Sequence, residues 1–275
     1  MKIKRQDAGA QLPRRRLISL TVLATLLLGV LLGSLFNPVQ PIRAALVEES
    51  AGSQVLIGED DDNLTNATIQ PPGVVANQSL NNADILVGGS RNDVLIGLLG
   101  SDVLVGGPGN DILIGGTEQG ATPNSDIIWG GEGNDINIWA PGDGSDAFLG
   151  GPGRDAQIFG VIDRVSNVPT LTGTAPGFPN GVPTANVSGA PGFCTLERVE
   201  EGSTLGYDFL VRFFVRATGA LAVTIRLSEV EQVFCTSQAG GQITFADLTV
   251  DNPQFVVVSL AEVRRINRIV AAIIR

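Results

Sequence analysis

An aspartate recurs through the middle of this chain at a nearly constant interval. Successive intervals are 9, 9, 9, 15, 9, 11 and 9 residues. A fixed period of this kind indicates one short structural unit that is repeated and stacked, which restricts the possible folds severely. The recurring residues are Asp84, Asp93, Asp102, Asp111, Asp126, Asp135, Asp146 and Asp155.

Each unit has the pattern of a glycine-rich turn followed by a short strand. The units are GGSRNDVLI, GLLGSDVLV, GGPGNDILI, GGEGNDINI and GGPGRDAQI, with six extra residues before Asp126 and two before Asp146. Gly suits a turn where φ is positive or where backbone approaches an ion, and the Asp supplies a carboxylate oxygen. Three residues remain for a strand, whose middle side chain is expected to face inward. The middle residues are Leu86, Leu95, Leu104, Leu113, Ile128 and Phe148, but Asn137 and Gln157 in the last coils, where we expect a less regular roll.

These units resemble the repeats-in-toxin (RTX), or haemolysin-type calcium-binding, family, whose consensus is G-G-x-G-x-D-x-U-x with U a large aliphatic residue. The resemblance covers residues 83–160. It implies a parallel β-roll with two nonapeptides per coil, in which Ca²⁺ lies between stacked turns and is bridged by carboxylate and carbonyl oxygens. The alternative is a β-helix whose Asp and Asn side chains satisfy turn amides without a metal. The consistent use of Asp favours calcium, because Asn would serve a neutral turn equally well.

Alternate turns would stack along the same side of such a roll, and the two rims would be unequal. One rim, called here the regular rim, collects only six-residue turns, while the second rim collects GLLGSD and the two turns with insertions. Arg91 and Leu98 replace turn glycines, one on each rim. We therefore expect calcium mainly on the regular rim, at Asp93, Asp111, Asp135 and Asp155 with Gly88, Gly106, Gly109, Gly130, Gly133, Gly150 and Gly153. The weaker candidates, on the second rim, are Asp84, Asp102, Asp126 and Asp146.

Residues 1–45 have the pattern of an export signal. Lys and Arg residues precede an apolar run from Leu17 to Phe36, which is long for a signal-peptide core and just long enough to span a bilayer. Cleavage at Ala44 or Ala45 is the favoured interpretation, and an uncleaved N-terminal anchor is the alternative. Only through such an anchor would a membrane be a partner. In both cases the protein is expected in the cell envelope or outside the cell.

Without residues 1–45 the chain carries 11 Arg, no Lys and 27 acidic residues, a net charge of −16. Nucleic-acid phosphates require Lys and Arg, so no nucleic-acid partner is expected. Hard cations such as Ca²⁺ suit this charge.

The other segments are assigned from composition. Residues 46–82 are expected to be a linker or capping segment, with a degenerate repeat or a simple acidic loop around Asp62. Residues 161–192, rich in Pro, Gly, Thr and Asn, are expected to be a linker. Residues 193–275 are expected to form a separate β-rich domain with a terminal helix that begins at a capping box, Ser259 to Glu262. The helix's apolar face is expected to pack on the sheet, the alternative being contact of its arginines with a membrane surface or secretion machinery. The expected strands are 207–215, 221–227, 230–236, 243–250 and 255–258.

Cys194 and Cys235 are the only cysteines, and an even pair in an exported chain predicts a disulfide, with free buried thiols as the alternative. The chain has no His, which excludes a Ser-His-Asp triad and a His-based zinc protease site. The leading hypothesis is a non-enzymatic calcium-binding structural protein whose roll folds on Ca²⁺. One alternative is an adhesin or matrix protein that binds a glycan or cell-surface partner through residues 193–275. Another is a polysaccharide-active enzyme with carboxylates paired from Glu197, Glu200, Glu201, Asp208, Glu229 and Glu231.

Overall fold

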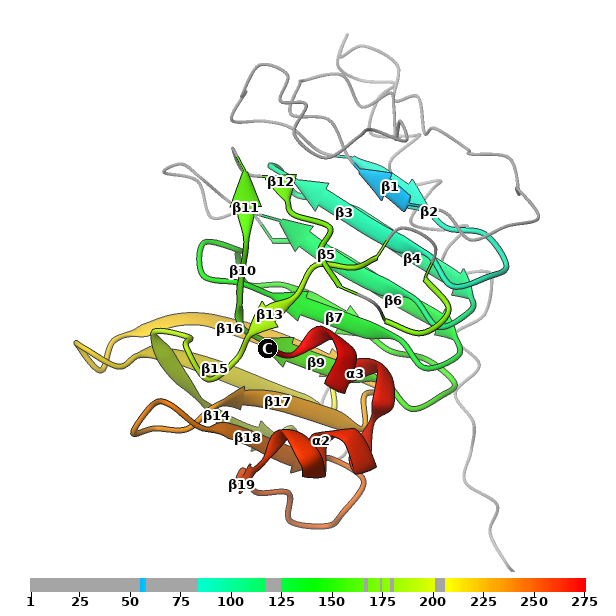
Figure 1. Ribbon diagram of the computed structural model, residues 1–275. Coiled ribbons are helices and arrows are strands. Elements are labelled where there is room, and N and C mark those ends of the chain that lie inside the picture. The colour runs from blue at the N-terminus through cyan, green and yellow to red at the C-terminus, as the bar shows by residue number, and fades with distance from the viewer. Residues whose placement is uncertain are drawn as a thin grey trace, which may run out of the picture. The chain divides into compact units, whose positions relative to one another are not determined.

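In the computed structural model, the strands that follow the repeated aspartates alternate between two sheets, and within each sheet these strands are parallel (Figure 1). The structure describes residues 55–57, 84–116, 125–165, 168–173, 175–178, 181–200 and 206–275. The predicted export signal and the acidic segment around Asp62 lie outside these ranges. Sheet 1 contains β1 (Val55–Ile57), β3 (Val94–Leu98), β5 (Ile112–Gly116), β7 (Ile136–Trp139) and β9 (Ala156–Phe159). Sheet 2 contains β2 (Ile85–Val87), β4 (Val103–Pro108), β6 (Ile127–Glu132) and β8 (Ala147–Leu149).

The interior of the roll is lined by the middle residue of each strand, as the nonapeptide pattern predicts. Leu86, Leu104, Ile128 and Phe148 stand in register on successive strands of sheet 2, and Leu95 and Leu113 do so on sheet 1. All six side chains are fully buried in one cluster. Burial of a side chain of this size stabilises the fold by about 1.5–3 kcal/mol, so this row supplies much of the energy that holds the sheets together.

The predicted polar positions in the last coils also point inward and hydrogen bond to each other, although Asn137 Oδ1 is buried without a partner. Asn137 and Gln157 are buried, and Asn137 Nδ2 donates to Gln157 Oε1 at 2.8 Å. Beside them the roll is filled by aromatic rings: Trp139 lies 5.5 Å from Phe159 and 4.8 Å from Phe213 between ring centroids. The roll therefore keeps its register through these coils, and its filling changes from aliphatic to aromatic and amide side chains.

The C-terminal strands extend the two sheets of the roll, in contrast to the separate domain that the sequence suggested. In sheet 1, β17 pairs with β9 in parallel, and in sheet 2, β16 pairs with β8 in parallel. All the described residues, from 55 to 275, belong to one compact unit. The added strands are β14 (Gly192–Arg198), β15 (Phe209–Val215), β16 (Leu221–Ser228), β17 (Gln232–Thr236), β18 (Ile243–Asp247) and β19 (Val256–Val258), five of which overlap the predicted strands.

The segment expected to be a linker covers the outer face of sheet 1. It contains short strands and buries Val182, Ala185 and Val187 against that face. The outward residues of the sheet, such as Ile114 and Ile138, are fully buried there. This explains why both faces of the sheet 1 strands are apolar. The short strands are β10 (Val161–Ile162), β11 (Arg164–Val165), β12 (Val168–Pro169) and β13 (Ala185–Asn186).

The predicted terminal helix is divided into α2 (Leu260–Ile266) and α3 (Arg268–Ile273), which lie over sheet 1 (Figure 1). The predicted capping box is present, because Ser259 and Glu262 hydrogen bond reciprocally. Asn267 is extended and caps α3 by accepting from the next turn's amides, which breaks the helix. Val263, Val270 and Ile273 are buried as the helical face predicts, whereas Leu260 is half exposed. No helix among the described residues is long and apolar enough to cross a membrane.

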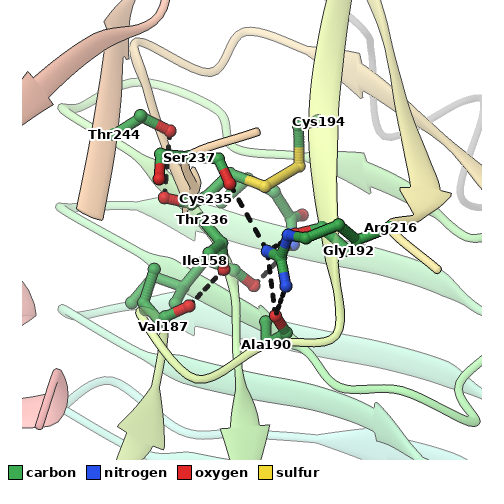
Figure 2. The surroundings of a disulfide bond; sticks show 11 residues. Ile158, Val187, Ala190, Gly192, Cys194, Arg216, Cys235, Thr236, Ser237 and Thr244 are labelled. Carbon is green, nitrogen blue, oxygen red and sulfur yellow. Dashed lines mark hydrogen bonds between the residues drawn. A yellow bond between two sulfur atoms is a disulfide. The ribbon is translucent and has the colours of Figure 1, made fainter. Parts of the chain in front are cut away.

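The predicted disulfide is present and joins the two sheets. Cys194 lies on β14 of sheet 2 and Cys235 on β17 of sheet 1, with their Cα atoms 6.1 Å apart. Figure 2 shows Arg216 beside this bond, donating to the carbonyl oxygens of Ala190 and Ser237. The bond and the guanidinium tie the C-terminal strands to the loop that precedes β14.

Candidate calcium-binding rims

The repeated aspartates form two carboxylate ladders, one along each rim of the roll. On the regular rim, the amide of Asp93 donates to Asp111 Oδ1, that of Asp111 to Asp135 Oδ1, and that of Asp135 to Asp155 Oδ1, each at 2.7 Å. One oxygen of each carboxylate thus fixes the start of the strand stacked on it. Each strand is thereby locked in register with its neighbour.

The second rim carries an equivalent ladder, which its irregular turns did not lead us to expect. The amides of Asp84 and Asp102 donate to the Oδ1 atoms of Asp102 and Asp126 at 2.7 Å, and Asp126 donates to Asp146 Oδ1 at 3.0 Å. The predicted difference between the rims is therefore absent from this hydrogen-bond pattern. The rims differ in their turns, which all have six residues on the regular rim and include the two insertions on the second rim.

The second carboxylate oxygen is the atom that points to a cation. Five Oδ2 atoms are buried without a hydrogen-bond partner, which is costly for an ionised carboxylate. They belong to Asp111, Asp135 and Asp155 on the regular rim and to Asp102 and Asp126 on the second. Asp93 differs, because its Oδ2 accepts from the amide of Gly89 at 2.6 Å.

The turn glycines expected beside the ions stand against these oxygens. A Cβ at Gly88 would lie 2.8 Å from Asp93 Oδ2, and one at Gly130 would overlap Asp135 Oδ2 and lie 2.6 Å from the carbonyl oxygen of Gly150. Gly106 and Gly150 are crowded in the same way. Glycine at these positions leaves the carboxylate and a main-chain carbonyl facing one small space. On the second rim, Gly97 does the same for Asp102 and the carbonyl oxygen of Gly115, and Gly115 stands against the carboxylate of Asp126.

The fourth-position glycines stack backbone on backbone. A Cβ at Gly133 would overlap the carbonyl oxygen of Gly109, and one at Gly153 the carbonyl oxygen of Gly133. Gly133 also has φ of +139°, a conformation that side chains disfavour. Arg91 in the outermost turn has no turn stacked beyond it among the described residues, so its Cβ meets no such barrier.

The donor set fits calcium when carbonyl oxygens are counted. Among the described residues no three Asp, Glu, His or Cys side chains gather at one point, because each carboxylate occupies its own level of the ladder. Ca²⁺ takes six to eight oxygens and accepts carbonyls readily. A carboxylate oxygen and stacked turn carbonyls at each level are ligands of this kind.

Without a metal ion, the surroundings of these carboxylates favour their protonated form. Burial raises the pKa of Asp111 and of Asp155 to about 8, and nearby carboxylates add to the effect. Burial likewise raises the pKa of Asp135 and of Asp126 to about 7. A cation would reverse this preference by stabilising the ionised form.

These pKa values predict how the metal-free protein responds to pH. The folded chain holds protons that the unfolded chain, with Asp pKa near 3.9, releases. Its free energy of unfolding should therefore fall as pH rises from about 4 to about 8. We expect the urea midpoint of metal-free protein to be lower at pH 8 than at pH 5, and saturating Ca²⁺ to remove this loss. A metal-free midpoint that is higher at pH 8 would contradict the assigned burial of these carboxylates.

Two features of the rims were not predicted from the sequence. Asn92, Asn110 and Asn134 form a side-chain ladder of their own beside the regular rim, with the amide of Asn110 bonded to Asn92 Oδ1 and that of Asn134 to Asn110 Oδ1, both at 2.8 Å. Their presence at one turn position in successive units was the available signal. Glu231 accepts from the amide of Asp155 at 2.7 Å and thus continues the carboxylate ladder, although no nonapeptide surrounds it.

The acids proposed for paired-carboxylate catalysis are dispersed among structural contacts. Glu197 pairs with Arg212, Asp208 accepts from the amide of Glu229 at 2.9 Å, and Glu231 accepts from Asp155. Glu201 lies outside the described ranges. Two hollows of about 480 and 230 Å³ are lined by Ser90, Arg91, Asn92, Pro108, Gly109 and Gly177, and by Pro176, Arg264, Arg268, Ala271 and Ala272. Neither hollow is lined by a carboxylate, so neither supports that alternative.

Comparison with known families agrees with this geometry. The family model of the RTX calcium-binding nonapeptide repeat matches four copies, over residues 80–117 and 122–136, which is less than half of the chain. No curated protein and no solved structure matches the chain. The coils formed by β8 and β9 continue the roll beyond the matched residues. Residues 80–117 and 122–136 are therefore RTX calcium-binding nonapeptide repeats, and Ca²⁺ is the ion that they imply.

Proposed function

We propose that this chain is an exported structural protein whose β-roll folds and becomes rigid when Ca²⁺ binds along the regular rim. The observation that carries the proposal is the row of buried carboxylates, each with one oxygen engaged in the ladder and the other unpaired at Asp111, Asp135 and Asp155. Without a cation these levels bring buried negative charges together. The proposal assigns no catalytic role to the chain.

The residues proposed to hold the ions share one arrangement, a carboxylate oxygen beside a turn glycine and a stacked carbonyl. When bound, Ca²⁺ supplies the positive charge that the buried carboxylates lack. The protein's part is to hold these oxygens at fixed levels through the strand register. The proposed ligands are Asp93, Asp111, Asp135 and Asp155 and the turns that contain Gly88, Gly106, Gly109, Gly130, Gly133, Gly150 and Gly153.

Regular turn stacking favours this rim over the second one. Gly109 donates to the carbonyl of Glu132 at 2.8 Å, and Gly133 to that of Pro152 at 3.0 Å, so successive turns are aligned. On the second rim, the turn before Asp126 carries six extra residues. Asp84, Asp102, Asp126 and Asp146 are accordingly proposed as weaker ligands.

An oxidising, calcium-rich compartment suits the other features of the chain. The disulfide between Cys194 and Cys235 is of the kind that persists outside the cytoplasm. Residues 1–45 have the charge and hydropathy of an export signal. Calcium at roughly 10⁻⁴–10⁻³ M, the range of extracellular modules, would then keep the roll folded.

The test compares Asp111→Asn with Asp126→Asn. At position 111 the amide oxygen can still accept from Asp93, while the unpaired oxygen is replaced by a donor and one charge is lost. We expect a roughly tenfold higher calcium midpoint for folding, because ligand charge sets affinity. Asp126→Asn removes the same charge on the second rim and should shift the midpoint less.

The measurement is the calcium midpoint of the folding transition, followed by circular dichroism at fixed ionic strength because salt screens charge. Equal shifts for the two variants would refute the preference for the regular rim. An unchanged midpoint in both would refute calcium-coupled folding through these carboxylates.

A further inference from the structure

We infer that the calcium rim continues past the nonapeptides, to a last cation site between the turn 150–155 and the turn 229–231, with Asp155 and Glu231 as its carboxylate ligands. This inference rests on the proposed function. It gives the C-terminal strands a direct part in calcium binding, although the turn that supplies Glu231 contains no glycine and no repeat motif.

Strand register places the two turns on successive levels of the same rim. Ser228, the end of β16, pairs with Leu149, and Gln232, the start of β17, pairs with Ala156. The turn 229–231 therefore connects sheet 2 to sheet 1 one level beyond the turn 150–155. Glu231 immediately precedes its strand, which is the position that the aspartate holds in each repeat.

Hydrogen bonds at this level repeat those of the ladder. Asp155 donates its amide to Glu231 Oε2 at 2.7 Å, the distance found between successive aspartates on the rim. The amide of Gln232 donates to the carbonyl of Asp155 at 3.0 Å, as Ala156 does to Asp135 at 2.8 Å. Glu231 is thus the structural equivalent of the next aspartate.

An unpaired buried oxygen faces this level as well. Asp155 has no exposed surface, and its Oδ2 has no partner. A Cβ at Gly150 would lie 2.5 Å from Asp155 Oδ2 and would overlap the carbonyl oxygen of Glu229. Glu229 thus presents its carbonyl where Gly150 presents one to the level before. Glu229 has φ of +54°, which is rare for a residue with a side chain and is part of the geometry of this tight turn.

A neutral acceptor would be sufficient if Glu231 only capped the ladder. The chain instead has a second carboxylate beside the buried one of Asp155, and hard oxygen ligands of this type suit Ca²⁺. An ion here would join the last repeat to the strand pair β16 and β17. Calcium binding would then stabilise the C-terminal strands as well as the repeats.

The decisive variant is Glu231→Gln in the chain without residues 1–45. The amide oxygen of Gln can still accept from the amide of Asp155. Bound calcium is counted by equilibrium dialysis, with Glu200→Gln, an exposed site, as the charge-matched control. We expect Glu231→Gln to bind about one ion fewer per chain, and Glu200→Gln to bind the parental number. An unchanged ion count in Glu231→Gln would overturn the inference.

Hydrogen exchange on the unmodified chain gives a second readout, which holds even if the variant fails to fold. Calcium is expected to slow exchange in residues 229–236 together with residues 106–111. Slowing at 106–111 without any at 229–236 would overturn this site and leave the proposed function standing. A parent chain that binds no calcium would instead overturn the proposed function.

Discussion

Gly133→Ala is expected to destabilise the roll severely, even in saturating calcium. The new Cβ would overlap the carbonyl oxygen of Gly109 in the adjacent turn, and the backbone at position 133 has φ of +139°. The obstacle is main chain, which cannot move without breaking the alignment of the turns. We expect a loss of more than about 4 kcal/mol in the free energy of unfolding, the range of the largest single-substitution effects.

Gly219→Ala is the matched control for this variant. Gly219 also has positive φ, +69°, but a Cβ there would meet nothing within 4 Å. Its cost should therefore be the conformational one alone, about 1–2 kcal/mol. Both variants are compared by urea unfolding in saturating calcium. Similar losses for the two would show that close stacking of turns at Gly133 is not required.

Removal of the disulfide is expected to lower the free energy of unfolding by about 2–4 kcal/mol in saturating calcium. Cys194 and Cys235 are 41 residues apart in sequence and lie on different sheets, so their bond restricts the unfolded chain and fastens the sheets together. The double variant Cys194→Ala with Cys235→Ala isolates this effect from that of leaving a free thiol.

Chemical reduction of the parent chain is the control for the double variant, because it breaks the disulfide while both cysteine side chains remain in place. Urea unfolding of the reduced parent should give a loss close to that of the double variant. Mapping of non-reduced peptides from exported protein should recover Cys194 linked to Cys235. Free thiols in that material, or a loss below about 0.5 kcal/mol, would contradict the assigned role.

The repeat could be predicted in detail because its period fixes both the turns and the inward positions. A strand has a period of two, so knowing that Asp93 ends a turn is sufficient to place Leu95 in the core. The same reasoning placed Asn137 and Gln157 inward. The hydrogen bond between these two side chains, which lie on adjacent strands, could be seen only in the structure, because insertions make the spacing between coils irregular.

The continuation of the roll into the C-terminal strands could not be predicted. A parallel strand is added by backbone hydrogen bonds, which leave no sequence motif when the connecting turn is as short as 229–231. The sequence therefore placed Glu231 only among the acids that could pair for catalysis. Residues 161–192 were likewise expected to be a linker, although they bury Val182 and Val187. The break in the terminal helix was equally hidden, because Asn267 is compatible with both a helix interior and a cap.

The central claim, that calcium folds this roll, is tested most directly by a calcium titration of the chain without residues 1–45. Far-ultraviolet circular dichroism follows strand formation while bound ions are counted, with Mg²⁺ as the control cation. The account predicts a cooperative gain of β structure at roughly 10⁻⁴–10⁻³ M calcium, reversed by chelator and not reproduced by Mg²⁺. Identical spectra and thermal midpoints in chelator and in saturating calcium would contradict it.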